Sequence, residues 1–324
     1  MRRRDFITLL GGAAVWPLAA RAQQPAMPVV GLLSGIDPDD RQLAAVRQGL
    51  NEAGFVAGKN VMIEYRSAAG HYDQLPALAN DLTRRKVAVI VTMLGTMSAL
   101  SAKAATMTIP VVFAIGTDPV KAGLVSSLNR PGGNVTGVTF LSNVLAAKRL
   151  GLLRELVPGI SAVGDLVNPT NPNAADETKD MQAAAQSLGL QLRIVNASTE
   201  PEIEAAFASF GEHRLKALIV TSDAFFMSRR DQLIALSASH ALPTMYWLRE
   251  LPAGGGLMSY GTSITEAFRA AGHYAGRVLN GEKPADLPVL QSTKFELVIN
   301  LKAAQTLGLT IPPGVLALAD EVLE

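Results

Sequence analysis

The sequence predicts an α/β protein made of two doubly wound, Rossmann-like lobes, each built on a parallel sheet. Short apolar runs rich in β-branched residues alternate with segments of helical spacing, which is typical of parallel strands covered on both faces by helices. The alternation starts a second time after the turn at 129–134. A chain of 324 residues is also long enough for two domains of ordinary size.

The first unit is predicted to alternate four strands with three helices. Its strands are expected at 28–33, 61–65, 87–92 and 110–115, and its helices at 40–52, 72–85 and 98–107. The first helix follows from Leu43, Val46 and Leu50, which recur at helical spacing on one face, and from Gly54, which can end it.

The second unit repeats the pattern. We expect strands at 161–167, 191–195, 217–221 and 243–246, and helices at 148–156, 178–188, 202–210 and 231–239. The chain therefore contains two α/β units in tandem, with neither a low-complexity linker nor a short repeat period.

The last part of the chain is expected to cross between the units several times. After the glycines at 254–256, the apolar strand at 257–260 is expected to return to the first lobe, followed by the helix at 266–279. The strand at 295–300 is expected in the second lobe. The predicted first lobe therefore comprises 27–140 plus 254–284, and the second comprises 143–250 plus 288–324. Several crossings would form a hinge rather than a loose tether.

Residues 1–22 have the order of a secretory signal peptide. Three arginines at 2–4 precede an apolar run, and Ala20-Arg21-Ala22 forms a small-x-small cleavage site, which predicts cleavage after Ala22. The arginine pair before Asp5 fits a twin-arginine (Tat) signal better than a Sec signal. About 12 apolar residues are too few for a membrane anchor, which needs about 20. We expect export to the periplasm by the Tat or Sec machinery, with signal peptidase as a further partner.

Composition excludes several classes of protein. The chain has no cysteine, which rules out a lipid-anchoring lipobox, a thiol nucleophile and a zinc site built on cysteine. Removing residues 1–22 leaves 25 basic and 27 acidic residues, a net charge of −2. A nearly neutral chain favours neither nucleic acid nor an anionic membrane as a partner. We expect a soluble monomer without a stable membrane anchor.

The segments that come near to known enzyme motifs do not have the residue spacing that those motifs require. Gly54–Lys59 is one residue short of a phosphate-binding loop, and the segment around Ser259 has one residue too many for a nucleophile elbow. The four histidines, at 71, 213, 240 and 273, show no metal-ligand spacing. We expect no catalytic residues, no metal and no cofactor, although spacing says nothing about a triad assembled from distant residues.

Candidate ligand-binding residues lie where the first unit's strands end, because ligands of doubly wound sheets bind beyond the carboxyl ends of the strands. The candidates are small polar residues and glycine: Ser34, Thr92, Gly95, Thr96, Ser98 and Asp118. A helix beginning near residue 96 offers unpaired N–H groups to a carboxylate, and Asp118 offers a partner to an ammonium group. Thr96, Ser98 and Asp118 are equally compatible with simple helix capping.

The second unit places Asn168, Asp223 and Tyr246 at the equivalent strand ends, and Tyr260 on the strand after the glycines. Asn168 and Asp223 are also natural turn formers. Tyr246, Trp247 and Tyr260 fit either an aromatic wall or an ordinary core. A binding site requires these residues to converge on one cleft between the lobes.

Several long segments resemble the tryptophan-binding-type family of ABC transporter substrate-binding proteins. They are TDPVKAGLVSSLNRPGGNVTGVT at 117–139, LVNPTNP at 166–172, SDAFFMSRRDQ at 222–232, GGLMSYG at 255–261, YAGR at 274–277 and DEVL at 320–323. The resemblance extends over 27–324. It implies the type I periplasmic-binding-protein fold, three crossings between the lobes, and an ABC permease with its ATPase as partners.

The resemblance also implies a small-molecule ligand, an amino acid or a similar small carboxylate, gripped by hinge closure. Ser34, Thr96, Asp118, Asn168, Asp223 and Tyr260 fall on the matching strand-end motifs. The chain departs from the family at Met97, where relatives often have proline. Two alternatives are a periplasmic sensor that presents its ligand to a membrane receptor kinase and an exported α/β enzyme.

Overall fold

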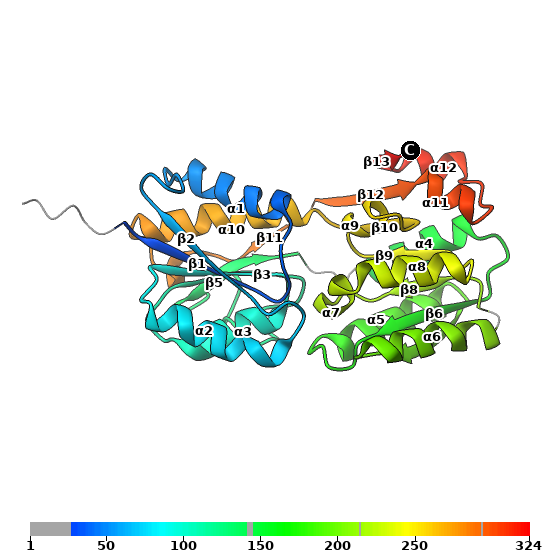
Figure 1. The fold of residues 1–324 in the computed structure, drawn as a ribbon, viewed down its shortest axis with the longest axis horizontal. Coiled ribbons are helices and arrows are strands. Elements are labelled where there is room, and N and C mark those ends of the chain that lie inside the picture. The colour runs from blue at the N-terminus through cyan, green and yellow to red at the C-terminus, as the bar shows by residue number, and fades with distance from the viewer. Residues whose placement is uncertain (1–26, 141–144, 214, 293) are drawn as a thin grey trace, which may run out of the picture.

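The computed structural model describes residues 27–140, 145–213, 215–292 and 294–324. Two α/β lobes lie side by side, each with its own sheet (Figure 1). The predicted signal peptide at 1–22 lies outside the described residues. Within the described part of the chain, no helix combines the length and the apolar character needed to span a membrane.

The first lobe is built on a six-stranded parallel sheet of order β11-β5-β4-β3-β1-β2. Its strands are β1 (Val29–Ser34), β2 (Met62–Ser67), β3 (Val89–Met93), β4 (Val111–Ile115), β5 (Val135–Thr139) and β11 (Leu290–Gln291). Helices α1 (Asp40–Glu52) and α10 (Ile264–Leu279) pack together on one face, and α2 (Leu75–Arg84) and α3 (Thr96–Ala105) on the other (Figure 1).

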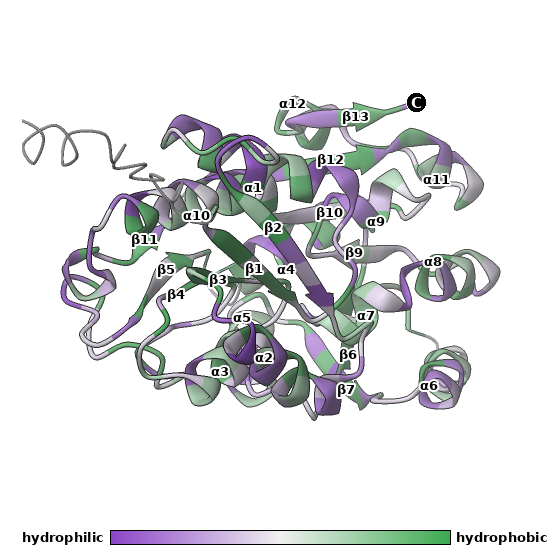
Figure 2. Cartoon of the chain, turned by 60° about the vertical axis from the view of Figure 1, so that its left-hand side comes forward, coloured by the Kyte–Doolittle hydropathy of each residue, from purple (hydrophilic) through white to green (hydrophobic). Residues whose placement is uncertain are grey.

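Central and edge strands differ in sequence as their positions require. The centrally placed β1 is hydrophobic along almost its whole length, whereas its neighbour β2 at the sheet edge mixes polar with apolar residues (Figure 2). A strand between two others and beneath helices on both faces must be apolar throughout.

The second lobe has a seven-stranded sheet of order β13-β12-β10-β9-β8-β6-β7, parallel except where β10 meets β12. Its strands are β6 (Ala162–Val167), β7 (Gln191–Asn196), β8 (Leu218–Val220), β9 (Thr244–Tyr246), β10 (Met258–Thr262), β12 (Phe295–Asn300) and β13 (Glu321–Leu323). Its helices are α4 (Ala146–Leu156), α5 (Ala174–Ser187), α6 (Glu200–Glu212), α7 (Ala224–Ser228), α8 (Arg230–Ser239), α9 (Glu250–Ala253), α11 (Leu301–Thr306) and α12 (Pro313–Ala317).

One predicted crossing is wrong. The strand at 257–260 does not return to the first lobe, because β10 pairs in parallel with β9 and antiparallel with β12 in the second sheet. The N–H groups of Gly254 and Gly256 both bond to the carbonyl of Leu251 at the end of α9, so the chain turns back beside β9. The chain crosses only after Thr262, and α10 then packs on α1, in the first lobe as expected.

The next passage also differs from the expectation. Residues 288–324 were assigned to the second lobe, but β11 pairs with Val138 and Thr139 of β5 in the first sheet. The chain therefore leaves the first lobe after Gln291 rather than before residue 288. A two-residue strand is too short to show a pattern in the sequence.

The chain passes between the two sheets three times: from β5 to α4, from β10 to α10, and from β11 to β12. These passages are hydrogen-bonded to one another. The Thr262 hydroxyl donates to the Phe140 carbonyl at 2.9 Å, and the Ser263 N–H donates to the Lys294 carbonyl at 3.0 Å. Three connected segments form a hinge, the number of crossings that the family resemblance implies.

Candidate functional site

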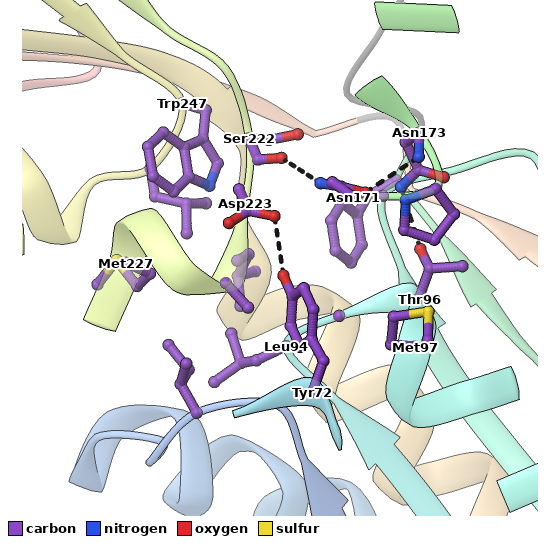
Figure 3. A pocket seen from close by; sticks show the side chains of 18 residues that line it. Tyr72, Leu94, Thr96, Met97, Asn171, Asn173, Ser222, Asp223, Met227 and Trp247 are labelled. Atoms are coloured by element: carbon purple, nitrogen blue, oxygen red, sulfur yellow. Dashed lines mark hydrogen bonds between the residues drawn. The ribbon is translucent and has the colours of Figure 1, made fainter. Parts of the chain in front are cut away.

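A cavity lies between the lobes, at the carboxyl ends of the parallel strands (Figure 3). The first lobe contributes Ile36, Tyr72, 94–97 and Gly116; the second contributes 171–173, 222–224, Met227, Trp247 and Leu248; Phe140 and Ile264 flank the crossings. The volume within which the centre of a water molecule can lie is about 80 Å³. A single water needs about 10–15 Å³ on that measure, so the cavity suits a small molecule.

The cavity is mostly apolar, with charge at one point. Leu94 and Met97 face it from the first lobe, and Met227 and Trp247 from the second (Figure 3). Among the described lining residues there is no lysine, arginine or histidine, and the only charged side chain is that of Asp223. A guest must therefore present an apolar body and no net negative charge near that carboxylate.

Asp223 is held firmly by its own lobe. It is the N-cap of α7, and its Oδ1 accepts from the Phe225 N–H at 2.8 Å and the Phe226 N–H at 3.3 Å. The buried Asn168 amide donates to the same oxygen at 2.9 Å. Burial raises the pKa of Asp223, while the hydrogen bonds from Asn168 and Tyr72 and from the backbone lower it. The carboxylate is thus oriented before any guest arrives.

The second oxygen of Asp223 binds the opposite lobe. The Tyr72 hydroxyl donates to Oδ2 at 2.8 Å across the cleft (Figure 3). Burial, and then the charge of Asp223, raise the pKa of this tyrosine. Tyr72 begins the short 3₁₀ turn Tyr72–Gln74 in front of α2, where we expected only the start of a helix. The turn follows the carboxyl end of β2, a strand-end position that the sequence analysis did not consider.

A second polar contact joins the lobes at the start of α3. The Asn173 amide donates to the Thr96 hydroxyl at 3.2 Å, and Thr96 shares a hydrogen bond of 3.0 Å with the Thr117 hydroxyl. The chain enters α3 through Gly95 at φ 139°, a conformation that favours glycine. The first residues of α3, Thr96 and Met97, thereby lie in the lining of the cavity.

The predicted residues divide into three groups. Gly95, Thr96 and Asp223 line the cavity. Ser34, Thr92, Ser98 and Asn168 are buried behind its lining: Ser34 donates to the Ile36 carbonyl, and Asn168 supports Asp223. Within the described part of the chain, the hydroxyls of Thr92 and Ser98 have no hydrogen-bond partner.

Three predicted residues are not brought to this cavity. Asp118 caps its own turn, accepting from the N–H groups of Val120 and Lys121, and lines a neighbouring cavity instead. Tyr246 is fully buried and shares a hydrogen bond with Ser237. Tyr260 packs against Phe295 with ring centroids 6.3 Å apart. These two tyrosines belong to the core of the second lobe, so of the three aromatic residues expected to form a wall only Trp247 lines the cavity.

Buried charges lie behind the second-lobe wall. Glu177 accepts from the Ser222 hydroxyl at 2.7 Å, and burial raises the pKa of Glu177 to about 7. Asp165 accepts from Thr221 at 2.8 Å, and burial raises the pKa of Asp165 to about 6. Arg149, whose pKa burial lowers to about 10, attracts both carboxylates and donates to the Tyr260 carbonyl. Local sequence pattern does not predict this cluster, because its members lie on three separate elements, α4, β6 and α5.

Across the described ranges, no group of three histidine, cysteine, aspartate or glutamate side chains is arranged to hold a metal ion.

Comparison with known proteins matches nearly the whole chain. The model of the family described as ABC transporter substrate binding protein matches residues 29–323. The tyrosine-binding protein of Clostridioides difficile (strain R20291) is 26% identical over 253 residues, which are 78% of this chain and 72% of that protein.

Solved structures agree with this match. The ABC domain from Streptococcus pneumonia in complex with L-Trp is 28% identical and has a TM-score of 0.84, with 91% of this chain and 99% of that chain covered. A conserved domain protein from Vibrio cholerae O1 biovar El Tor (strain N16961) gives the same four values. More distant solute-binding proteins share the fold, which is that of type I periplasmic binding proteins.

Proposed function

Because this chain belongs to the ABC transporter substrate-binding protein family, we propose that it captures a small molecule in its cleft and delivers it to an ABC permease with its ATPase. The guest is an amino acid or a similar small carboxylate. The observation that carries the proposal is a mostly apolar cavity with walls from both lobes and one oriented carboxylate, Asp223. The relatives named for tyrosine and for L-Trp support an amino acid.

The chemistry of the cavity favours a guest of mixed polarity. Asp223 can accept from an ammonium group, and the first N–H groups of α3, at Thr96 and Met97, can donate to a carboxylate. The apolar walls accommodate the remainder of the guest. Ligand pockets commonly combine such walls with a few fixed polar groups that set selectivity.

Closure about the hinge provides the mechanism. A guest stabilises the closed arrangement only through contacts that it makes there and not in the open one. Contacts between the lobes, such as that between Tyr72 and Asp223, likewise form only when the two lobes lie close together. The permease then recognises the closed form, and no reaction takes place on the guest.

The proposed setting is the periplasm. Residues 1–22 direct export through the Tat or Sec machinery, and signal peptidase cleaves after Ala22. The mature chain acts there as a monomer without a membrane anchor. The absence of cysteine, and hence of a lipid-anchoring site, supports a freely diffusing carrier.

A thermal-shift panel of L-amino acids and small carboxylates on residues 23–324 tests the proposal. A ligand at 100 times its Kd adds about 2.7 kcal/mol to the stability of the folded state, and the melting temperature rises clearly. Mass spectrometry of the bound compound should recover it unchanged. A panel without any stabilising compound would contradict the proposal, and recovery of a converted product would identify an enzyme instead.

A further inference from the structure

The two hydroxyl groups on one wall of the cavity, those of Tyr72 and Ser222, direct their protons away from the guest. The Tyr72 hydroxyl donates to Asp223 at 2.8 Å, and the Ser222 hydroxyl donates to Glu177 at 2.7 Å. The Asn171 amide donates to the Ser222 carbonyl at 3.0 Å (Figure 3). A hydroxyl has one proton and two lone pairs, so Tyr72 and Ser222 keep only lone pairs for a ligand.

Asp223 completes this wall as an acceptor. Its Oδ1 already accepts three hydrogen bonds, whereas its Oδ2 accepts only from Tyr72 and retains a further acceptor site. The wall formed by Tyr72, Ser222 and Asp223 is therefore rich in acceptors. The donors of the lining are the first N–H groups of α3, the Trp247 indole and the second N–H of the Asn171 amide.

We propose that Tyr72, Ser222 and Asp223 form an amine-recognising wall, and that Glu177, buried behind it, keeps the wall free of donors by accepting the proton of Ser222. This inference rests on the proposed function and names the part of the site that selects the ligand. Glu177 does not touch the ligand and is a positioning residue. A ligand with an ammonium group satisfies the wall, whereas one with only a carboxylate leaves it unpaired.

The surroundings of Glu177 make its charge sensitive to pH. Arg149 on α4 favours its ionised form, whereas burial, Asp165 on β6 and Asp223 oppose it. Asp118, Lys121 and Asp176 line the cavity on its other side. Burial, the largest of these effects, raises the pKa of Glu177 to about 7. Once protonated, Glu177 donates to Ser222, and the Ser222 proton turns towards the ligand and repels an amine.

Ligands that share one body but differ in their charged groups test the inference. The probes are L-tryptophan, tryptamine and indole-3-propionate, together with L-tyrosine, tyramine and 3-(4-hydroxyphenyl)propionate, titrated calorimetrically into residues 23–324. Ser222→Ala should weaken binding of the amine-bearing probes by about tenfold or more, the effect of one hydrogen bond to a charged group. The two propionates should bind weakly to the wild type and change little.

The pH profile separates positioning from a structural role. Wild-type affinity for the amines should fall by up to about tenfold from pH 8 to pH 6, as one titrating group allows. Glu177→Gln should flatten this profile, because an amide does not titrate. Asp165→Asn removes a charge that raises the pKa of Glu177, so this variant should keep the fall in affinity but move it to lower pH, and Ser259→Ala, at a buried serine on β10, should bind like the wild type.

The outcomes distinguish this inference from the proposed function. If the wild type binds the amino acids but Ser222→Ala binds them equally well, the amine-recognising wall is refuted and the carrier function stands. If Glu177→Gln keeps the wild-type pH profile, the proposed positioning of the Ser222 proton by Glu177 is refuted. If the wild type prefers the propionates, or binds none of the six probes, the inference fails, and the amino-acid panel decides the proposed function separately.

Discussion

Replacing Tyr72 with phenylalanine should open the cleft. The substitution removes the hydroxyl that donates to Asp223 at 2.8 Å across the lobes and keeps the ring that lines the cavity. A hydrogen bond to a charged group contributes about 1.5–3 kcal/mol. Its loss should therefore shift the equilibrium between closed and open forms of the ligand-free protein by about ten- to 100-fold towards the open form.

Double electron–electron resonance, which measures the distance between two spin labels, can follow this shift. The chain has no cysteine, so spin labels at Met107→Cys and Glu204→Cys report one distance between the lobes. Met107 is 91% exposed in the first lobe, and Glu204 is exposed on α6 in the second. The protein is freed of ligand by unfolding and refolding before measurement. The Tyr72→Phe variant should show a larger population at the distance of the open form.

Tyr274 provides a matched control. Its hydroxyl donates to the Pro288 carbonyl at 2.8 Å within the first lobe, so Tyr274→Phe removes a comparable bond without affecting the cleft. The distance distribution of this variant should equal that of the wild type. If Tyr72→Phe also gives the wild-type distribution, the contact between Tyr72 and Asp223 does not hold the lobes together, and the reasoning is refuted.

Three further predictions concern packing, pH and fluorescence. Gly272→Ala should destabilise the first lobe by about 1–3 kcal/mol in urea unfolding, because its new Cβ would lie against the Val46 carbonyl; Gly151→Ala, which has open space in α4, should be neutral or stabilising. Because burial raises the pKa of Glu177 in the folded state, its protonation contributes stability that is fully present below about pH 4.5 and is lost as the pH rises through about 7. Lowering the pH from 8 to 5 should therefore raise the free energy of unfolding of the wild type relative to that of Glu177→Gln. Trp247 is the only tryptophan beyond residue 22, so a saturating ligand should change its emission; unchanged emission would place the ligand elsewhere.

The two doubly wound units could be predicted from local pattern. The runs at 28–33 and 110–115 become β1 and β4, since a strand buried on both faces leaves a continuous apolar signature. The helix at 40–52 was predicted with the bounds of α1, because apolar spacing and a stop at Gly54 mark both its face and its end. The alternation predicts which segments form strands, but not which sheet each joins.

Sheet membership after residue 254 needed information that local pattern does not contain. An apolar strand such as β10 fits either sheet, and only its partners β9 and β12 decide. The glycines before it were expected to precede a return to the first lobe, but they end α9 and reverse the chain. The antiparallel pairing with β12 depends on a segment that returns only after α10 and β11.

The site was predictable where it follows strand ends and not where it depends on long-range contact. Asp223 and Thr96 were chosen by position and both line the cavity. Tyr72 was missed because its role depends on Asp223, 151 positions away. Glu177 was missed because it stands just before the helix expected at 178–188, where a glutamate normally faces solvent; in the structure it lies in the first turn of α5, buried beside Ser222.

Hydrogen–deuterium exchange with and without a bound amino acid tests the central claim most directly, namely that one small molecule is gripped by both lobes. We predict protection on binding in the segments 94–97 of the first lobe and 222–227 of the second, together with the crossings near Phe140 and Ile264. Protection confined to one lobe, or to the separate groove around Leu257 and Leu307, would contradict it.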